Sequence, residues 1–392
     1  MFFIGIDIAK FSHEAVVINS DGQIIQHSFN FKNSCSGYNQ LLEKVRKITK
    51  DKKQLVFGME STGHYWLALY TRLKKDGYTT FVINPLQSDA LRNLDIRQSK
   101  TDSKDSLIIA DVIRFGRFSE TAVPHETQFA LRELCRNRFF FVDAMSDMKR
   151  KVTALLDQIF PEYSSLFNDI FGQASSAVLL KYQTPEKLAH ANLTSLTNML
   201  LTYSNGYFGK AKAMELKSAA KNSFGISDPN NIFSDLIVNY MQTIEVMQEK
   251  IKLIEQKIKG IMDTLNSPIT SIPGIGLILG ATIISEIGDI SRFSSADKLA
   301  AFAGLDPSVK QSGNFTSSRN HMSKRGSPYL RRAIWMASTI AYHSDPMFHA
   351  YYDKKSAEGL RYMNIIGHMT KKMSSVIFAV LRDNKAYTLR TS

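Results

Sequence analysis

The sequence predicts a mixed α/β domain at the N-terminus, followed by long coiled-coil helices and a mainly helical C-terminal domain. Strand and helix patterns alternate over the first 120 residues, two long heptad series lie in the middle, and helical segments flank polar loops in the last third. The chain has 392 residues, of which 44% are hydrophobic, which suffices for two or three domains. The expected domains are 1–125, 126–268 and 269–392.

Three strands are expected to open the chain as a meander, because β-branched and aromatic runs at 2–8, 14–18 and 24–31 surround the turn residues Ser20 to Gln23. The next elements are predicted as a helix, a strand, a helix and a strand, at 38–48, 55–59, 65–73 and 79–83. This order is the one expected of an RNase H-like sheet. The pattern alone does not separate that sheet from other α/β folds, and it says nothing about function.

Four acidic residues of this region are candidate metal ligands. Asp7 lies inside the first predicted strand, where a carboxylate is costly unless something compensates it, and Glu60 ends the fourth strand. Asp102 and Asp105 are three residues apart at a predicted helix start, so they face the same side. Carboxylates that converge at one sheet edge repel each other unless cations hold them. Two divalent ions about 3.5 to 4 Å apart would supply that compensation and clamp a phosphodiester.

Three of these acids, taken singly, also have an ordinary structural interpretation. Asp102 can be a helix N-cap, Asp105 a first-turn acid favoured by the helix dipole, and Glu60 a solvated strand end. Asp7 has no such alternative. The set of four therefore favours a metal site more than any member does alone.

Two heptad series predict a pair of long helices. The first runs from Leu131 to Ile159 and is stopped by Pro161, and the second runs from Tyr240 to Leu265. These helices can form an antiparallel hairpin within one chain or pack against another subunit, and the sequence does not choose. Residues 162–235 predict a helical insertion at the tip of the coil.

Two loops of the last third are candidate phosphate sites. Pro273-Gly274-Ile275-Gly276 resembles a helix-hairpin-helix turn, whose backbone N–H groups can bind a DNA phosphate, although a tight turn needs the same glycines for steric reasons alone. Ser312 precedes a glycine in a polar loop flanked by cations, where a phosphate-directed nucleophile would be exposed. An ordinary loop serine is the alternative.

The positive charge of the chain is concentrated near its C-terminus. The chain has 49 Lys and Arg against 36 Asp and Glu, a net charge of +13, and residues 309–392 hold 14 of these bases against four acids, which gives 14 − 4 = +10. A localised basic surface favours a nucleic-acid partner. The candidate nucleic-acid-binding residues are Lys100, Lys104, Gly274, Gly276, Lys310, Arg319, Lys324, Arg325, Arg331 and Arg332.

Several other classes of protein are disfavoured. The apolar stretch 275–284 is shorter than the roughly 20 residues of a membrane span, and the N-terminus lacks the basic start of a secretory signal. Cys35 and Cys135 provide neither a disulfide framework nor a zinc-ligand spacing. We therefore expect a cytoplasmic protein without a membrane partner.

Eight short motifs occur in a fixed order: Gly5–Lys10, Glu60–Gly63, Val82–Pro85, Lys100–Asp105, Ile272–Gly276, Ala301–Leu305, Gln311–Gly313 and Ser323–Gly326. In these motifs the chain resembles, over nearly its whole length, the DEDD-type insertion-sequence transposases related to the Piv DNA invertase, serine recombinases described as bridge-RNA-guided. The resemblance implies a RuvC-like N-terminal domain whose acids Asp7, Glu60, Asp102 and Asp105 bind Mg²⁺, with Mn²⁺ as an alternative ion. It also implies a C-terminal transposase domain with Ser312 as the catalytic serine.

The function implied by this resemblance is transposition of an insertion sequence through a covalent phosphoserine intermediate. The implied partners are donor and target duplex DNA, a structured noncoding bridge RNA, and further copies of the chain in a dimer or tetramer held by the coiled-coil helices. Its site of action would be the prokaryotic nucleoid. Two alternatives stay open: a metal-only nuclease of the Holliday-junction resolvase type, which would not need Ser312, and a non-catalytic nucleic-acid-binding scaffold.

Overall fold

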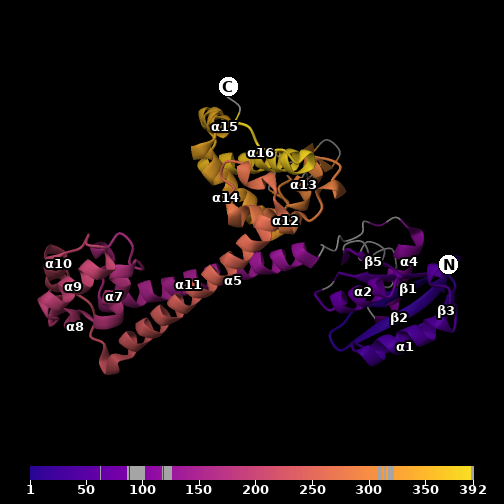
Figure 1. Cartoon of the computed structure of the whole chain (residues 1–392), viewed down its shortest axis with the longest axis horizontal. Coiled ribbons are helices and arrows are strands. Elements are labelled where there is room, and N and C mark those ends of the chain that lie inside the picture. Colours follow the sequence, from indigo (N-terminus) through magenta and orange to yellow (C-terminus); the bar gives the residue numbers. More distant parts are fainter. Residues whose placement is uncertain are drawn as a thin grey trace. The chain divides into compact units, whose positions relative to one another are not determined.

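The computed structural model describes residues 1–61, 63–85, 88, 102–116, 118, 126–306, 311–312, 315–316 and 322–389. Of Asp102, Pro229, Gln311, Ser312, Phe315 and Thr316 it describes the backbone only. The chain divides into two compact units, Met1–Val123 and Pro124–Ser392 (Figure 1). None of the described helices is long and apolar enough to cross a membrane.

The first unit is built on a five-stranded sheet with the strand order β3-β2-β1-β4-β5. The strands are β1 (Phe2–Asp7), β2 (Ser12–Asn19), β3 (Ile24–Lys32), β4 (Leu55–Glu60) and β5 (Thr79–Ile83). The first three are antiparallel neighbours, as expected of a meander, whereas β4 pairs parallel to β1 and β5 parallel to β4. All five predicted strands are therefore present.

Helices cover both faces of this sheet. α1 (Cys35–Arg46) and α2 (Trp66–Lys75) share an apolar core with Ile4 and Ile6 of β1, and the 3-10 turn η1 (Lys52–Gln54) leads into β4. α4 (Asp102–Phe115) packs on the opposite face. Gly5 allows this close approach, because a Cβ atom there would collide with the carbonyl of Ser106 and the backbone nitrogen of Ala110. Since side chains alternate along a strand, odd-numbered residues of β1 face α4.

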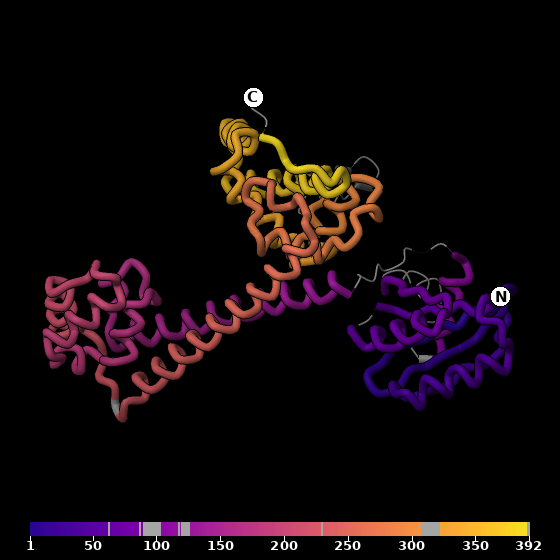
Figure 2. Tube along the Cα trace, in the orientation of Figure 1, coloured from indigo at the N-terminus to yellow at the C-terminus, as the bar shows by residue number. Residues whose placement is uncertain are grey.

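The second unit contains two helices of 34 residues each, α5 (Glu126–Ile159) and α11 (Ile232–Leu265). They run side by side in opposite directions (Figure 2). The Nε atom of Arg138, near the start of α5, lies 2.7 Å from Oε1 of Glu255, near the end of α11. The two heptad helices therefore pair within one chain.

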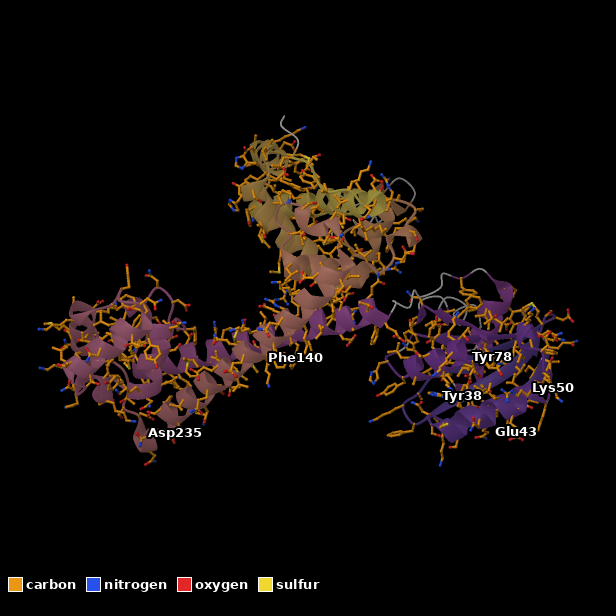
Figure 3. All side chains as sticks on the ribbon, in the orientation of Figure 1. Tyr38, Glu43, Lys50, Tyr78, Phe140 and Asp235 are labelled. Atoms are coloured by element: carbon orange, nitrogen blue, oxygen red, sulfur yellow. The ribbon has the colours of Figure 1, made fainter. Side chains whose placement is uncertain are left out.

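Near the N-terminal end of α5, the buried residues are not the ones that the heptad series predicts. Cys135 and Phe139 are buried although the series does not contain them, whereas Leu134 is only partly buried. The reason is that this part of α5 contacts α12 as well as α11, so it buries a second stripe. Phe140 projects from the outer side of α5 (Figure 3).

Each end of the helix pair carries an apolar core. At one end, Val152 and Leu156 of α5 and Ile237 of α11 pack with the predicted helical insertion. The insertion consists of α6 (Tyr163–Leu166), α7 (Gln173–Tyr182), α8 (Pro185–Ala189), α9 (Leu193–Tyr203), α10 (Lys210–Lys221) and the 3-10 turn η2 (Pro229–Asn231).

The other core joins the start of α5 and the end of α11 to the C-terminal helices. These are α12 (Leu277–Ile287), α13 (Ala296–Phe302), α14 (Pro328–Ser344), α15 (Pro346–Ala357) and α16 (Tyr362–Asp383), with the 3-10 turns η3 (Pro268–Ser271) and η4 (Ile290–Arg292) and the short strands β6 (Gln311–Ser312) and β7 (Phe315–Thr316). α12 ends before Gly288, where the backbone has a φ of +67°. The second unit thus has two separate cores on one helix pair.

Gly5→Ala is expected to destabilise the protein by about 3 kcal/mol, because the added methyl group meets backbone atoms of α4 that cannot move aside. Gly260→Ala on α11 is the matched control, since nothing lies within 4 Å of its new Cβ atom and alanine favours helix. We expect it to stabilise the protein by about 0.5 to 1 kcal/mol. Urea unfolding of both variants measures this, and equal effects would contradict the packing of α4 against β1.

Candidate active site

Asp7 and Glu60 lie next to each other at the ends of two parallel strands. The register of β1 and β4 places Ile6 opposite Met59, so the next residue on each strand is one of these acids. Both point to the face covered by α4, because the glycine two residues earlier on each strand packs against α4. Asp7 belongs to the first strand, as expected, and pairs with Glu14 of β2. The strand ends at Asp7, one residue earlier than predicted, so the half-buried carboxylate stands at the end of the strand.

α4 brings a third acid to the same edge. The helix begins at Asp102, as the sequence predicts. Its Ser106 lies against Gly5, whereas Arg114, near its other end, reaches the turn after β2. The first turn of α4 therefore lies at the end where β1 finishes. Asp105, in that turn, is only 6% exposed.

The chemistry of these side chains fits a divalent cation. Carboxylate oxygens are the ligands that Mg²⁺ and Mn²⁺ prefer in proteins. The hydroxyl of Ser88 donates a hydrogen bond to Oε1 of Glu60 and so orients that carboxylate. Among the side chains that the structure describes, no three His, Cys, Asp or Glu residues form a metal cluster, and the side chain of Asp102 is not among those described. Binding of a metal by all four acids stays a prediction.

Ser312 lies in a short hairpin rather than in an irregular loop. β6 and β7 pair antiparallel, with Ser312 opposite Phe315. The sequence contains a signal for this hairpin, because Gly313-Asn314 is a favoured two-residue turn and Phe315-Thr316 favours a strand. The structure describes only the backbone of Ser312, so it gives no orientation for the side chain.

The segments on either side of the serine hairpin are joined at their base. The N–H of Ser323 donates to the carbonyl of Asp306 at 2.8 Å. Nη1 of Arg331 donates to the carbonyls of Ala303 and Lys324, at 3.1 and 3.3 Å. The guanidinium of Arg331 thus holds the two ends of the loop together from α14.

A buried carboxylate connects this loop to the helix pair. Glu286 of α12 has a side chain only 4% exposed, and its two oxygens accept hydrogen bonds from Nε and Nη2 of Arg136 on α5, at 2.7 and 3.0 Å. The hydroxyl of Ser327 donates to the same carboxylate at 2.8 Å and also caps α14 through the N–H of Leu330. Glu286 and Arg136 were not among the residues predicted from the sequence. The available signal was a single carboxylate at the end of an apolar helix.

The predicted nucleic-acid-binding cations have different surroundings. Arg332 forms two hydrogen bonds of 2.7 Å with Asp143 of α5, and these bonds lower the pKa of Asp143 because they stabilise its ionised form. The exposed members of the set are Lys104, Lys324 and Arg325. The members outside the described residues are Lys100, Lys310 and Arg319.

The two glycines of the helix-hairpin-helix-like turn also differ. Gly274 has a φ of +86°, and a Cβ atom there would collide with the carbonyl of Ala337 on α14. Close packing is therefore sufficient reason for this glycine. Gly276 is exposed at the N-terminus of α12, where nothing lies within 4 Å of an added Cβ atom. Its backbone is the better placed of the two for a phosphate.

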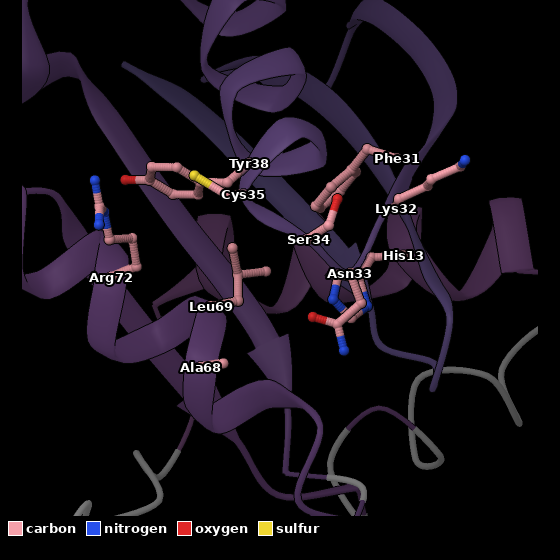
Figure 4. A pocket seen from close by; sticks show the side chains of 10 residues that line it. All are labelled: His13, Phe31, Lys32, Asn33, Ser34, Cys35, Tyr38, Ala68, Leu69 and Arg72. Atoms are coloured by element: carbon pink, nitrogen blue, oxygen red, sulfur yellow. The ribbon is translucent and has the colours of Figure 1, made fainter.

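The first unit also has a pocket on the side of α1 and α2 (Figure 4). Its volume is about 280 Å³, and it is lined by His13, Phe31, Lys32, Asn33, Ser34, Cys35, Tyr38, Ala68, Leu69 and Arg72. Burial lowers the pKa of His13, which keeps its imidazole neutral, and Asn33 offsets part of this effect. Since the acids face α4, this pocket is not part of the acidic edge.

Two parts of the chain match models of transposase families. Residues 4–161 match a model described as a transposase of the DEDD and IS110 type, and residues 266–353 match one described as the transposase IS116/IS110/IS902 family. The chain is 25% identical to an uncharacterised 44.8 kDa protein of insertion element IS116 from Streptomyces clavuligerus, across 98% of this chain and 96% of that protein. It is 24% identical to a pilin gene-inverting protein of Moraxella lacunata, across 99% and 98% of the two chains.

Arg136→Ala is expected to destabilise the protein by about 2 to 4 kcal/mol, because it leaves the carboxylate of Glu286 buried without its cation. Arg150→Ala is the control. Arg150 pairs with Asp147 at the surface, and such pairs contribute about 0 to 1 kcal/mol. Thermal unfolding of both variants tests this, and similar small effects would show that Glu286 does not depend on Arg136. Replacing both members, as in Arg136→Met with Glu286→Met, should recover most of the loss.

Proposed function

We propose that the chain acts as a transposase of the IS116/IS110/IS902 type and that it cuts and rejoins DNA through a covalent phosphoserine link formed by Ser312. The observation that carries this proposal is the position of the predicted site residues. Asp7 and Glu60 end neighbouring strands and Asp105 lies in the first turn of α4, all inside the first region of family similarity, and Ser312 lies inside the second. Both parts of the proposed chemistry are thus present in one chain.

We take the first unit to have an RNase H-like, RuvC-like fold. The strand order, with an antiparallel meander followed by two parallel strands, supports this assignment. Asp7 ends β1, Glu60 ends β4 and Asp105 lies in the first turn of α4, one turn after Asp102, which supports a site at this end of the sheet. A divalent ion held by these four acids would supply positive charge to a phosphodiester during its cleavage.

Ser312 would act as the nucleophile. Its Oγ forms a bond to the phosphorus of a DNA phosphodiester while the bond from phosphorus to the 3′ oxygen breaks. The serine loses its proton and the leaving oxygen gains one, which produces a 3′-hydroxyl and a phosphoserine link. The 3′-hydroxyl of a different strand can then attack this link and release the serine. Because the link conserves the bond energy, no external energy source is needed.

We also propose that a structured noncoding RNA pairs with donor and target DNA. The net charge of +10 in residues 309–392 supports a protein that grips nucleic-acid backbones, and no base-reading motif is recognisable in the sequence. A homo-oligomer is proposed as well. Phe140, Val246 and Leu253 remain 64%, 52% and 51% exposed on the helix pair, which favours contact with another copy.

A metal-only nuclease is the second candidate function. The observation that favours it is that all four predicted acids belong to the first unit, whereas Ser312 belongs to the second. Such an enzyme would use water as its nucleophile and would not need Ser312. The two functions therefore predict different products, since only the recombinase attaches the protein to DNA.

Ser312→Ala is expected to abolish a covalent adduct between the protein and DNA, with a loss of at least about 1,000-fold, because no other group replaces the nucleophile. The assay incubates the chain with the end DNA of its element, the adjacent noncoding transcript and Mg²⁺, and then measures adducts that resist denaturation. Ser375→Ala, an exposed serine on α16, is the control and should retain the adduct. Cleavage that persists in Ser312→Ala would refute the serine mechanism and favour the metal-only nuclease.

Asp105→Asn is expected to lower Mg²⁺-dependent cleavage by about 100-fold or more, because an amide binds a divalent cation more weakly than a carboxylate does. Asp111→Asn is a matched control on the same helix. Asp111 pairs with Arg114 at 2.9 Å, away from the sheet edge, so the variant should keep near-normal activity. Cleavage rates across a Mg²⁺ titration test this, and a normal Mg²⁺ dependence in Asp105→Asn would show that the metal assignment is wrong.

A further inference from the structure

Two arginines lie one helical turn apart near the start of α5, Arg132 and Arg136. Both are near the last turn of α12, which carries Glu286. Arg136 is compensated by its two hydrogen bonds to Glu286. Arg132 has no comparable partner, because its Nε is buried and makes no hydrogen bond within the part of the chain that the structure describes.

The charges around Arg132 leave positive charge in excess. The carboxylate of Glu286 already accepts two hydrogen bonds from Arg136 and one from Ser327. Burial lowers the pKa of Arg132, and the positive charge of Arg136 lowers it further, while Glu286 and Glu133 offset only part of this effect. A guanidinium stays charged in proteins, so its environment favours the arrival of an anion.

A third arginine adds to the same region. Arg292 follows α12, its Nε donates to the carbonyl of Ile287 at 3.1 Å, and its guanidinium lies 4.4 Å from the ring centres of Phe293 and Phe302. Burial lowers its pKa too. Among the described residues it forms no ion pair. The last turn of α12 thus bonds to Arg136 and Arg292 and acts electrostatically on Arg132, and among the described residues only Arg136 has a bonded carboxylate there.

The guanidinium fits anions with paired oxygens, because its N–H groups form a planar fork that matches a carboxylate or a phosphate. The proposed nucleic-acid partner supplies phosphates. The three arginines are also connected to the segment that follows the Ser312 hairpin. Ser327, which bonds to Glu286, comes next in the sequence after the exposed Arg325 and Gly326. We propose that Arg132 binds a phosphodiester of a nucleic-acid backbone beside this segment.

A purely structural role for Arg132 makes the opposite prediction about stability. Its guanidinium lies 5.2 Å from the centre of the Phe129 ring, and a stacking role would make its removal destabilising. If Arg132 instead waits for a phosphate, its removal relieves an uncompensated buried donor. Thermal stability should then stay unchanged or rise, while nucleic-acid affinity falls. We rely on the proposed function only in taking nucleic acid as the anion.

The test measures binding of the full chain to duplex DNA of the element's end and, in a second arm, to the adjacent noncoding transcript, each over a range of salt concentrations. Arg132→Gln should weaken binding about tenfold at fixed salt and lower the salt slope by about one, as loss of one phosphate contact predicts. Arg132→Lys should keep the salt slope and recover part of the affinity. Lys221→Gln, which removes an exposed charge at the end of α10, should change neither.

The two arms identify the source of the phosphate, since a lowered slope for DNA alone or for RNA alone assigns Arg132 to that nucleic acid. Unchanged binding of both by Arg132→Gln, together with a lower melting temperature, would overturn the inference and leave Arg132 as a structural residue. Failure of the unmodified chain to bind either nucleic acid would overturn the proposed function as well. The Arg132 variants keep Ser312 and are judged by nucleic-acid binding, whereas Ser312→Ala is judged by the covalent adduct. The two proposals can therefore fail separately.

Discussion

The antiparallel pairing of α5 with α11 is the constraint on which the second unit depends. Each helix has 34 residues, yet α5 has no fully buried side chain between Phe139 and Val152. A two-helix pair cannot surround its own seam, and helices in proteins are stabilised mainly by tertiary packing. The stability of the pair must therefore come from its two ends. There, the insertion and the C-terminal helices provide buried partners for Leu131, Val152 and Ile258.

Glu286 connects the helix pair to the start of α14, next to the segment that contains Ser312. A carboxylate that is almost fully buried is tolerated only with a bonded cation, and Arg136 of α5 supplies it. Because Ser327 bonds to the same carboxylate and caps α14, the start of that helix is tied to both α5 and α12. The loop base is thus positioned by electrostatics as well as by apolar packing. One turn earlier on α5, the Nε of Arg132 is buried and makes no hydrogen bond among the described residues, and there we propose that an anion binds.

The acidic edge of the first unit follows from simpler geometry. Alternation along parallel strands places Asp7 and Glu60 on one face, at one end. Gly5 lets α4 approach the sheet closely enough to bring Asp105 to that end. A helix turn with a buried acid beside two strand ends that carry acids is a suitable place for a divalent cation, which is why we propose phosphodiester chemistry there.

The sequence by itself determined the elements of this protein and their order. Strand and helix periods are local, so the five strands, the two long helices, the helix start at Asp102 and the strand end at Glu60 could all be predicted from neighbouring residues. The ordered motifs likewise indicated the family. The hairpin around Ser312 had a local turn signal, but the polar character of its surroundings concealed it.

Only the tertiary structure decided which distant groups meet. It paired α5 with α11 within one chain, gave Arg331 and Arg332 partners inside the protein, and showed that Gly274 is needed for contact with α14. It also brought Arg136 to Glu286, 150 residues away, and left the Nε of Arg132 without a hydrogen bond among the described residues. These outcomes depend on the distances between packed helices. A one-dimensional pattern records the residue types but not those distances.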